Sequence, residues 1–440
     1  MDIQILFRTI IFLVSLVGSI MIGLPIAYCL IFSAVALGFY MGGNFTNPQH
    51  VALNLMSGTD SVTMMALPFF VLAGELMNKG GLTRRIIAFC DIFVGRVRGG
   101  LGYVTILACL MFASLVGSAV ASTAALGAIL IPMMVASGYN RAKAAGLVAS
   151  ANIVAPIMPP SVPMIVYGVA AGVSIKSLFL GGIAPAIYLT IGMSVVWFIA
   201  SRKDAIKSDK PKPTFKEAVM IIGSGMWALL LPIIILVGLR GIGPIKAIFT
   251  ATECGVVAVV YALIVGVFVY RELKPKDVFH AFIASAKMSA VVMFLAAAAQ
   301  VSAKLLTFSR VPQFITQSLE PLVAHPMLLN AILHTIIIFM GMVIDVVPTI
   351  LIMTPIMLPL LRAAGIDPIY FGIVFTLSNV LGLTSPPVGP VLNVACATGK
   401  VKMEELIPPV IPYYIFQVIL VYLLIFFPQL VIIPLKWIGG

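Results

Sequence analysis

Apolar windows about 20 residues long recur along the whole chain, and 61% of its 440 residues are hydrophobic. A helix of that length crosses the hydrocarbon core of a bilayer, where every backbone polar group must be paired within the protein. A soluble core could not bury this much apolar surface. The sequence therefore predicts an all-α polytopic membrane protein surrounded by membrane lipid.

Charge and motif content exclude several other functions. A net charge of +12 would suggest nucleic acid as the partner of a soluble protein, but in a membrane protein basic residues report orientation, so we expect no nucleic-acid partner. The five cysteines are scattered without metal-site spacing, the four histidines form no cluster, and no GxxxxGK[ST] phosphate loop is present. We therefore expect no organic cofactor and no ATP hydrolysis.

The only long hydrophilic segment, residues 201–217, contains six Lys or Arg residues and divides the chain into halves, 1–200 and 218–440. Each half is predicted to hold about five spans and one hairpin. The hairpins are expected at about 102–137 and 327–361, and the helices broken by prolines at about 142–172 and 368–398.

Other segments are assigned by length and polarity. Residues 82–98 are amphipathic and are predicted to form a helix at the membrane interface. Residues 306–322 are predicted to form an amphipathic arm. Residues 44–50 are predicted to form a polar loop, and a last span is expected near 407–433. The three tryptophans, Trp197, Trp227 and Trp437, lie near predicted span ends and are expected to be interfacial anchors.

The two halves repeat each other at an ungapped offset of 227 residues. Matching prolines and glycines are strong evidence for a repeated fold, because both residue types constrain backbone shape. The same shift places Ser118 opposite Asp345 and Ser122 opposite Thr349. The matching pairs include Asn152 with Asn379, Pro159 with Pro386, Pro160 with Pro387, Gly172 with Gly399, and Pro185 with Pro412.

The repeat also predicts a topology. If both hairpins are re-entrant, each half has five crossings, and an odd number of crossings inverts the second half. With the linker in the cytoplasm, 19 of the 27 basic residues lie inside. If each hairpin instead crosses the membrane as two full spans, the excess of basic residues on the cytoplasmic side is lost. We therefore predict an inverted repeat with both termini in the periplasm or outside the cell.

Broken helices in an inverted repeat are expected to form substrate and ion sites near the bilayer midplane. Hydroxyl, amide, carbonyl and carboxylate oxygens suit Na⁺ rather than a transition metal. The first candidate set is Gly117, Ser118, Ser122, Thr123, Asn152, and the break at Pro159, Pro160 and Ser161. The second set is Asp345, Thr349, Asn379, Thr384, Ser385, and the break at Pro386 and Pro387.

Each of these features also has a structural interpretation. Clusters of small residues allow helices to pack closely, and proline kinks are common in membrane helices. Asp345 could act only as a helix cap, although a carboxylate inside a membrane usually has a function. For Glu75 and Glu253 we favour structural hydrogen bonds over ion binding.

Six segments resemble the large membrane subunit of the tripartite ATP-independent periplasmic (TRAP) transporters, of the DctM type. They are LPFFVLAGELMNKGGLTRRI at 67–86, GSAVAS at 117–122, MPPSVPMIVYGV at 158–169, TATECGVVAVVYA at 250–262, GIDPIYFGIV at 365–374 and SPPVGPVLNV at 385–394. The resemblance extends over nearly the whole chain.

The resemblance implies an elevator-type secondary transporter of a bacterial inner membrane that imports an organic acid with Na⁺. The acid would be a sugar acid, such as sialic acid or diketogulonate, or a C4-dicarboxylate. GMVID at 341–345 looks more like the sugar-acid importers. Two partners are implied: a small four-helix membrane subunit of the DctQ type and a periplasmic binding protein of the DctP type.

By the same resemblance, the substrate carboxylate would lie between the hairpin tips. Substrate contacts are expected at Ser118, Ser122, Asn152, Asn379 and Ser385. One Na⁺ would be held by Ser118, Thr123, Pro159 and Ser161, and another by Asp345, Thr349, Thr384 and Pro387.

Two other functions compete with this interpretation. One is a stand-alone Na⁺/anion symporter of the same superfamily. The other is a membrane-embedded enzyme that uses Asp345 as an acid or base. No second carboxylate, His or Cys shares the repeat position of Asp345, so an enzyme is not expected.

Overall fold

A computed structural model describes residues 3–43, 47–61, 64–202, 214–241, 248–311, 314, 317, 319–386 and 388–439. Within these ranges all regular secondary structure is helical. Eight of the described helices are long and apolar enough to cross a membrane. The predicted class, an all-α polytopic membrane protein, is confirmed. Most of the predicted basic linker, 203–213, and most of 312–318 lie outside the described residues, as does Pro387.

The helices of the first half begin with α1 and end with α10. Their bounds are α1 Ile3–Met21, α2 Ile26–Met41, α3 Pro48–Thr59, α4 Ala66–Lys79, α5 Leu82–Val94, α6 Gly100–Val116, α7 Ala119–Ala136, α8 Arg141–Ala151, the 3-10 turn η2 Asn152–Val154, α9 Val162–Ala171 and α10 Ile175–Ser201.

The helices of the second half follow in a similar order. Their bounds are α11 Phe215–Arg240, α12 Ala251–Ile264, the π-helical turn η3 Val265–Val269, α13 Pro275–Phe308, α15 Glu320–Val323, α16 Pro326–Gly341, α17 Val346–Ala363, α18 Pro368–Leu383, α19 Pro390–Gly399, α20 Met403–Phe426 and α21 Gln429–Gly439.

Helix bounds follow the offset of 227 residues. Shifted by that number, α7 takes the bounds of α17, and the first residue of α8 becomes the first residue of α18. Shifted α10 begins one residue before α20. Similar sequence signals thus produce similar local structure in both halves. The inverted orientation of the halves across the membrane stays a prediction.

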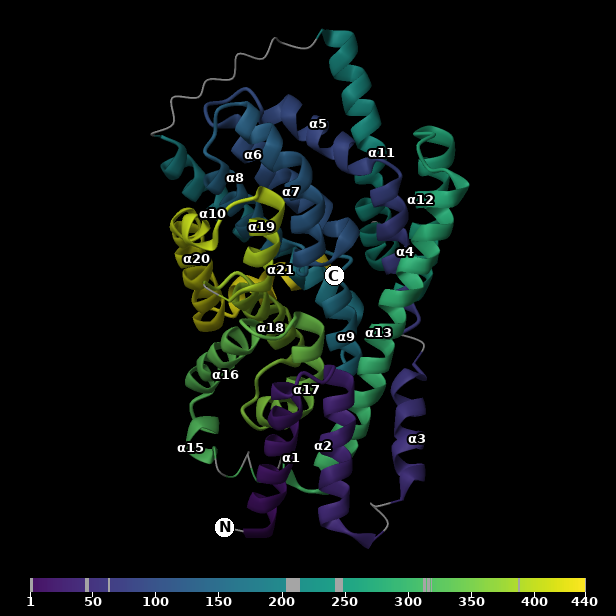
Figure 1. Ribbon diagram of the computed structural model, residues 1–440, viewed down its shortest axis with the longest axis vertical. Helices are drawn as coiled ribbons and strands as arrows, with labels where there is room; N and C mark the ends of the chain where they lie inside the picture. Colours follow the sequence, from purple (N-terminus) through teal and green to yellow (C-terminus); the bar gives the residue numbers. More distant parts are fainter. Residues whose placement is uncertain are drawn as a thin grey trace.

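The helices pack as two groups. In Figure 1, α16, α18 and α20 lie to the left of α13, and α3 lies to its right. We call α1–α4 and α11–α13 the framework group; in it α13 contacts α2, α3 and α4, and α12 packs on α4. We call α6–α10 and α16–α21 the hairpin group. In the hairpin group the second helix of each hairpin packs on the broken helix of the other half, α7 on α19 and α17 on α9. Helix α5 joins the groups by packing on both α6 and α11.

Two helix boundaries differ from the prediction. Residues 48–50, expected in a polar loop, begin α3, because Asn47 caps the helix by accepting a hydrogen bond from Gln49 N and Pro48 occupies the first helical position. The last span does not run to residue 433. Helix α20 ends at Phe426, since Pro428 has no N–H to continue the hydrogen-bond ladder, and α21 starts at Gln429.

Trp197 is not the interfacial anchor that we expected. Its side chain is 0% exposed, and its Nε1 donates a hydrogen bond to Gly99 O at 2.8 Å. A Cβ on Gly102 would overlap the indole ring, so the glycine allows this close packing. Trp197 therefore fixes the base of the first hairpin to α10. Trp227 and Trp437 are exposed.

Candidate functional site

The tip of the first hairpin is a two-residue turn between α6 and α7. Gly117 adopts a left-handed conformation with φ of 65°, and Ser118 caps α7 by accepting a hydrogen bond from Ala121 N at 3.4 Å. A Cβ on Gly117 would lie 3.3 Å from Val162 N, at the start of α9. The first tip therefore lies directly against the break in the first broken helix.

The tip of the second hairpin presents Asp345. Its Oδ1 caps α17 by accepting a hydrogen bond from Val346 N at 2.7 Å, and its backbone carbonyl accepts one from Thr349 Oγ1 at 2.9 Å. The Asp345 residue is exposed rather than enclosed, and its Oδ2 makes no hydrogen bond with any described residue. Asp345 is thus a helix cap and also an open carboxylate.

Both tips line one cavity of about 260 Å³, which we call the tip cavity. The framework group closes its other side with residues from α4 and α13. The lining contains two carboxylates, Glu75 and Asp345, and no Lys, Arg or His. Its other polar side chains are Asn78 and Ser118. The cavity therefore lies between the two groups of helices, and each group contributes one carboxylate to its lining.

Three helix N-termini also face the tip cavity. Residues from the first turns of α7, α9 and α17 lie in its lining, including Ala119, Pro163 and Val347. The N-terminus of a helix carries a partial positive charge of about 0.5, and its free N–H groups point outwards. This arrangement suits the carboxylate of a bound anion, as helix N-termini commonly bind anions.

Several predicted residues lie outside the tip cavity and are fully buried. Asn152 Oδ1 has no hydrogen-bond partner among the described residues, nor does either side-chain atom of Asn379, its repeat equivalent. The hydroxyls of Ser122 and Thr123 also lack partners there. An unpaired buried oxygen costs about 1–3 kcal/mol, so such a group usually has a partner. Hydroxyl and amide oxygens are of the kind that can bind an alkali cation.

Residues at the breaks of the two broken helices make local hydrogen bonds. Ser161 caps α9, accepting from Met164 N at 3.3 Å, and donates to Pro156 O. Thr384 donates to Leu381 O at 3.0 Å, and Ser385 shares a 2.6 Å hydrogen bond with Tyr414. Pro159, Thr384 and Ser385 are buried. Of the five predicted substrate contacts, the tip cavity includes Ser118 but not Ser122, Asn152, Asn379 or Ser385.

Sequence reasoning missed the framework wall of the tip cavity. Met288, Val292 and Leu295 come from α13, where no helix break marked them. Glu75 was expected to make structural hydrogen bonds, but it makes none with the described residues. Glu253 does make structural hydrogen bonds. Its Oε2 accepts one from Thr250 N at 2.7 Å and one from Thr250 Oγ1 at 2.9 Å, in a capping box at the start of α12.

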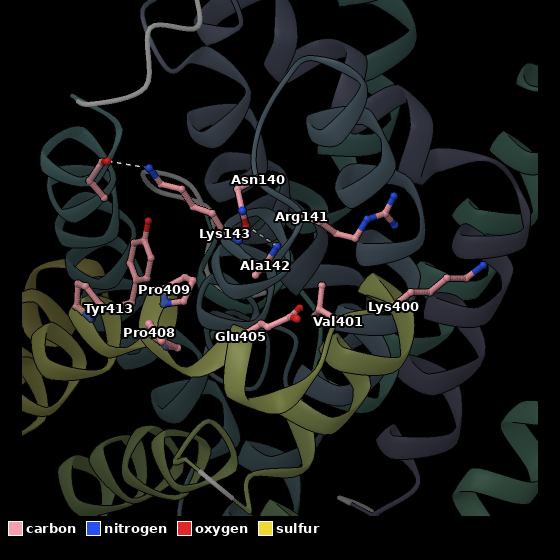
Figure 2. Close-up of a pocket in the computed structure, with 12 residues that line it drawn as sticks. Asn140, Arg141, Ala142, Lys143, Lys400, Val401, Glu405, Pro408, Pro409 and Tyr413 are labelled. Atoms are coloured by element: carbon pink, nitrogen blue, oxygen red, sulfur yellow. Dashed lines mark hydrogen bonds between the residues drawn. The ribbon is translucent and has the colours of Figure 1, made fainter.

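A second cavity, of about 570 Å³, lies where α8 and α20 begin. Figure 2 shows Lys143 pointing away from Arg141 and Lys400. The Nζ of Lys143 donates a hydrogen bond to Ala200 O at 2.8 Å. In this view Glu405 lies between Lys143 on one side and Lys400 on the other. The three cations of this cavity therefore do not point to one common site. No group of three or more His, Cys, Asp or Glu among the described residues could hold a metal ion.

Comparison with known proteins identifies the family. The sequence model of one family, described as "Tripartite ATP-independent periplasmic transporter, DctM component", matches residues 13–430. The chain belongs to this family. The resemblance that was first based on six short motifs is thereby confirmed, and the chain is a multi-span component of a transporter.

Individual relatives agree with this assignment to the DctM family. The chain is 45% identical to the 2,3-diketo-L-gulonate TRAP transporter large permease protein YiaN of Escherichia coli, over 98% of this chain and 99% of that protein. It is 33% identical to the C4-dicarboxylate TRAP transporter large permease protein DctM of Pseudomonas aeruginosa, over 89% of this chain and 90% of that protein.

A solved structure has a similar fold. The YdaH transporter of Alcanivorax borkumensis superposes with a TM-score of 0.60, covering 89% of this chain and 88% of that one, at 14% identity. At that identity the likeness concerns the fold alone. It agrees with the all-helical transporter architecture of this DctM family member.

Proposed function

We propose that this chain is the large membrane subunit of an importer that carries an organic acid into the cell together with Na⁺. The observation that carries the proposal is the tip cavity, where both hairpin tips and the N-termini of α7, α9 and α17 meet. In an elevator-type mechanism, the hairpin group would move against the framework group with its cargo bound at their boundary. The membrane would be a bacterial inner membrane, with both termini in the periplasm.

The substrate is proposed to be a sugar acid of the diketogulonate or sialic acid kind, with a C4-dicarboxylate as the second candidate. The relative with 45% identity is named for 2,3-diketo-L-gulonate, which favours a sugar acid over the dicarboxylate of the relative with 33% identity. The carboxylate would accept hydrogen bonds at the three helix N-termini, close to Ser118.

Two sodium ions are proposed, one beneath each hairpin tip. Oxygens of Ser118, Thr123, Pro159 and Ser161 would hold the first, and oxygens of Asp345, Thr349, Thr384 and Pro387 the second. The unpartnered hydroxyl of Thr123 and the unpartnered amide oxygens of Asn152 and Asn379 support cation binding nearby. The two sites would be unlike, because only the second contains a formal negative charge.

The chain is proposed to work with a small four-helix membrane subunit and a periplasmic binding protein that delivers the acid. A stand-alone symporter is the alternative. Exposed apolar side chains on α1 and α11, such as Val14 and Met220, leave these framework helices free to contact lipid or a second membrane subunit.

Uptake into reconstituted vesicles tests the proposal. Vesicles containing the chain and its small subunit should accumulate radiolabelled 2,3-diketogulonate, sialic acid or succinate when an inward Na⁺ gradient and the cognate binding protein are both present. Replacing Na⁺ with K⁺ should abolish uptake of the preferred acid. Equal uptake in K⁺ would refute Na⁺ coupling, and full uptake without the binding protein would favour the stand-alone symporter.

A further inference from the structure

His334 is a fully buried histidine on α16, the first helix of the second hairpin. Its Nδ1 shares a hydrogen bond of 3.0 Å with Ser378 Oγ on α18, and its ring centroid lies 4.7 Å from that of Phe371. Its Nε2 has no hydrogen-bond partner among the described residues. An ionisable side chain inside a membrane protein usually marks a functional position. His334 does not line the tip cavity, so its role must depend on its contact with α18.

Contacts along α16 and α18 show that the two helices run in the same direction. Near the start of both helices, Asn330 Nδ2 donates a hydrogen bond to Tyr370 OH at 3.1 Å. Near their ends, a Cβ on Gly341 would overlap the backbone carbonyl of Asn379. The hydrogen bond of His334 lies between these two contacts. The second hairpin and the second broken helix are therefore in contact along most of their length.

Side-chain hydrogen bonds fix the register of this helix pair. Apolar packing is not directional, so by itself it resists small sliding or rotation of one helix on another only weakly. A hydrogen bond is directional and requires a donor–acceptor distance of about 2.7–3.2 Å. Asn330 and His334 are the buried polar side chains of α16, one turn apart on the same face. The other buried side chains of α16 are Leu329, Leu333, Ile337 and Ile338.

The register matters because the proposed second cation site takes its oxygens from both segments. Helix α16 leads into the tip that carries Asp345, whereas α18 carries Asn379 and ends directly before Thr384. Ser378, the partner of His334, is the residue next to the unpartnered amide of Asn379. A binding site works only when its groups are held within about 0.5 Å of the required geometry, commonly by hydrogen bonds behind the groups that bind.

We propose that His334 is a positioning residue for the second cation site. Its hydrogen bond with Ser378 holds α18 against the second hairpin, and thereby holds the oxygens of Asn379 and Thr384 in place relative to Asp345. The histidine touches neither the cation nor the substrate, and Nδ1 is the atom that acts. This inference rests on the proposed Na⁺-coupled transport and adds to it a residue outside the binding site.

Na⁺ alone is the probe for the test, so no substrate has to be known. The purified full chain is heated in increasing NaCl, with choline chloride holding ionic strength constant, and its unfolding midpoint is recorded. A ligand that binds the folded state raises this midpoint. The midpoint without Na⁺ reports stability, and the Na⁺ concentration that gives half of the rise reports cation affinity.

Three substitutions separate the two ring nitrogens from the ring itself. His334→Asn places an amide near the position of Nδ1, where it can still bond to Ser378, whereas His334→Gln places its amide near the position of Nε2. His334→Phe keeps a ring and removes both nitrogens. We expect the asparagine variant to keep the wild-type half-effective Na⁺ concentration. In the glutamine and phenylalanine variants it should rise about fivefold, which corresponds to about 1 kcal/mol of binding free energy.

Two further variants test whether the effect belongs to this hydrogen bond. Ser378→Ala should raise the half-effective Na⁺ concentration as His334→Phe does, and the double variant should show no further rise, because both changes remove the same contact. Ile337→Val is the matched control, since it removes a buried methyl group from α16 and should lower the midpoint without Na⁺. Its half-effective Na⁺ concentration should stay unchanged. An equal rise in this control would reduce the role of His334 to packing and refute the inference.

The outcomes separate this inference from the proposed function. If the wild type responds to Na⁺ and the phenylalanine, glutamine and Ser378→Ala variants respond equally well, His334 does not position the site and Na⁺ coupling stands. A wild-type response of His334→Gln with a weakened response of His334→Asn also refutes the inference. If the wild type itself does not respond to Na⁺, both proposals fail. Should His334→Phe not fold, the contrast between the asparagine and glutamine variants decides in the same way.

Discussion

The equivalent residues Ser118 and Asp345 show how one backbone position serves two purposes. Each caps the second helix of its hairpin, so each is required locally by helix structure. Only Asp345 adds a formal charge; it lines the tip cavity, and its Oδ2 makes no hydrogen bond with any described residue. Capping and ion binding are therefore not alternatives at this residue, because the two carboxylate oxygens can serve them separately.

Substitution of Asp345 should separate these two roles. Asp345→Asn retains an oxygen that can accept from Val346 N, so we expect a near-normal unfolding midpoint but no Na⁺-dependent uptake. Asp345→Ala also removes the cap, which should lower the free energy of unfolding by about 1 kcal/mol. Uptake assays and thermal unfolding of both variants check this. Normal uptake by the asparagine variant would show that the charge is not needed.

At the scale of helices, glycines allow each hairpin to lie against a broken helix. A Cβ on Gly341, at the end of α16, would overlap the backbone carbonyl of Asn379 on α18, and one on Gly382 would lie 2.7 Å from Gly341 Cα. The second hairpin and the second broken helix thus approach to backbone contact. This close approach holds the unpartnered amide of Asn379 beside the hairpin.

An alanine at Gly341 should disturb this contact. The added methyl group must displace backbone, and overpacking of this kind usually costs about 1–3 kcal/mol. We therefore expect Gly341→Ala to lower the unfolding midpoint and weaken the Na⁺ response of the protein. Gly223→Ala is the control, because a Cβ there meets nothing within 4 Å. Unfolding curves for both variants, with and without Na⁺, test this, and equal behaviour would contradict it.

At the scale of the whole molecule, the tip cavity is lined by residues of both groups of helices. The framework group contributes Glu75 and an apolar wall, whereas the hairpin group contributes both tips and the three helix N-termini. Movement of one group past the other would separate the two carboxylates. We therefore expect the net charge in the tip cavity to control the movement of the hairpin group against the framework group.

The predicted topology can be tested by cysteine labelling. In a variant without the native cysteines, cysteines placed at the exposed residues Arg96 and Lys402 should react with a membrane-impermeant maleimide only from the cytoplasmic side. A cysteine at the exposed residue Gln4 should react only from the periplasm. These sides follow from five crossings in each half and from the excess of cytoplasmic basic residues. If the cysteines at positions 96 and 402 react from opposite sides of the membrane, the inverted repeat is refuted.

Much of the fold could be predicted because its signals are local. Apolar length predicted the helical membrane class, and prolines and glycines at one offset located the two broken segments and hairpin turns. The helix cap at Asn47 and Pro48 was also a local signal, so α3 could have been recognised. Ser118 and Asp345 were found for the same reason, as polar residues at helix ends within apolar stretches.

The sequence by itself therefore determined the membrane class, the repeated plan and the residues at the hairpin tips. Only the tertiary structure decided which of these residues share a cavity, added Glu75 to the cavity that Asp345 lines, and buried Trp197 against Gly102. The physical reason is that α7 and α10 are apolar on nearly all sides, so their sequences do not indicate which face looks inward. That choice depends on contacts between helices far apart in the chain.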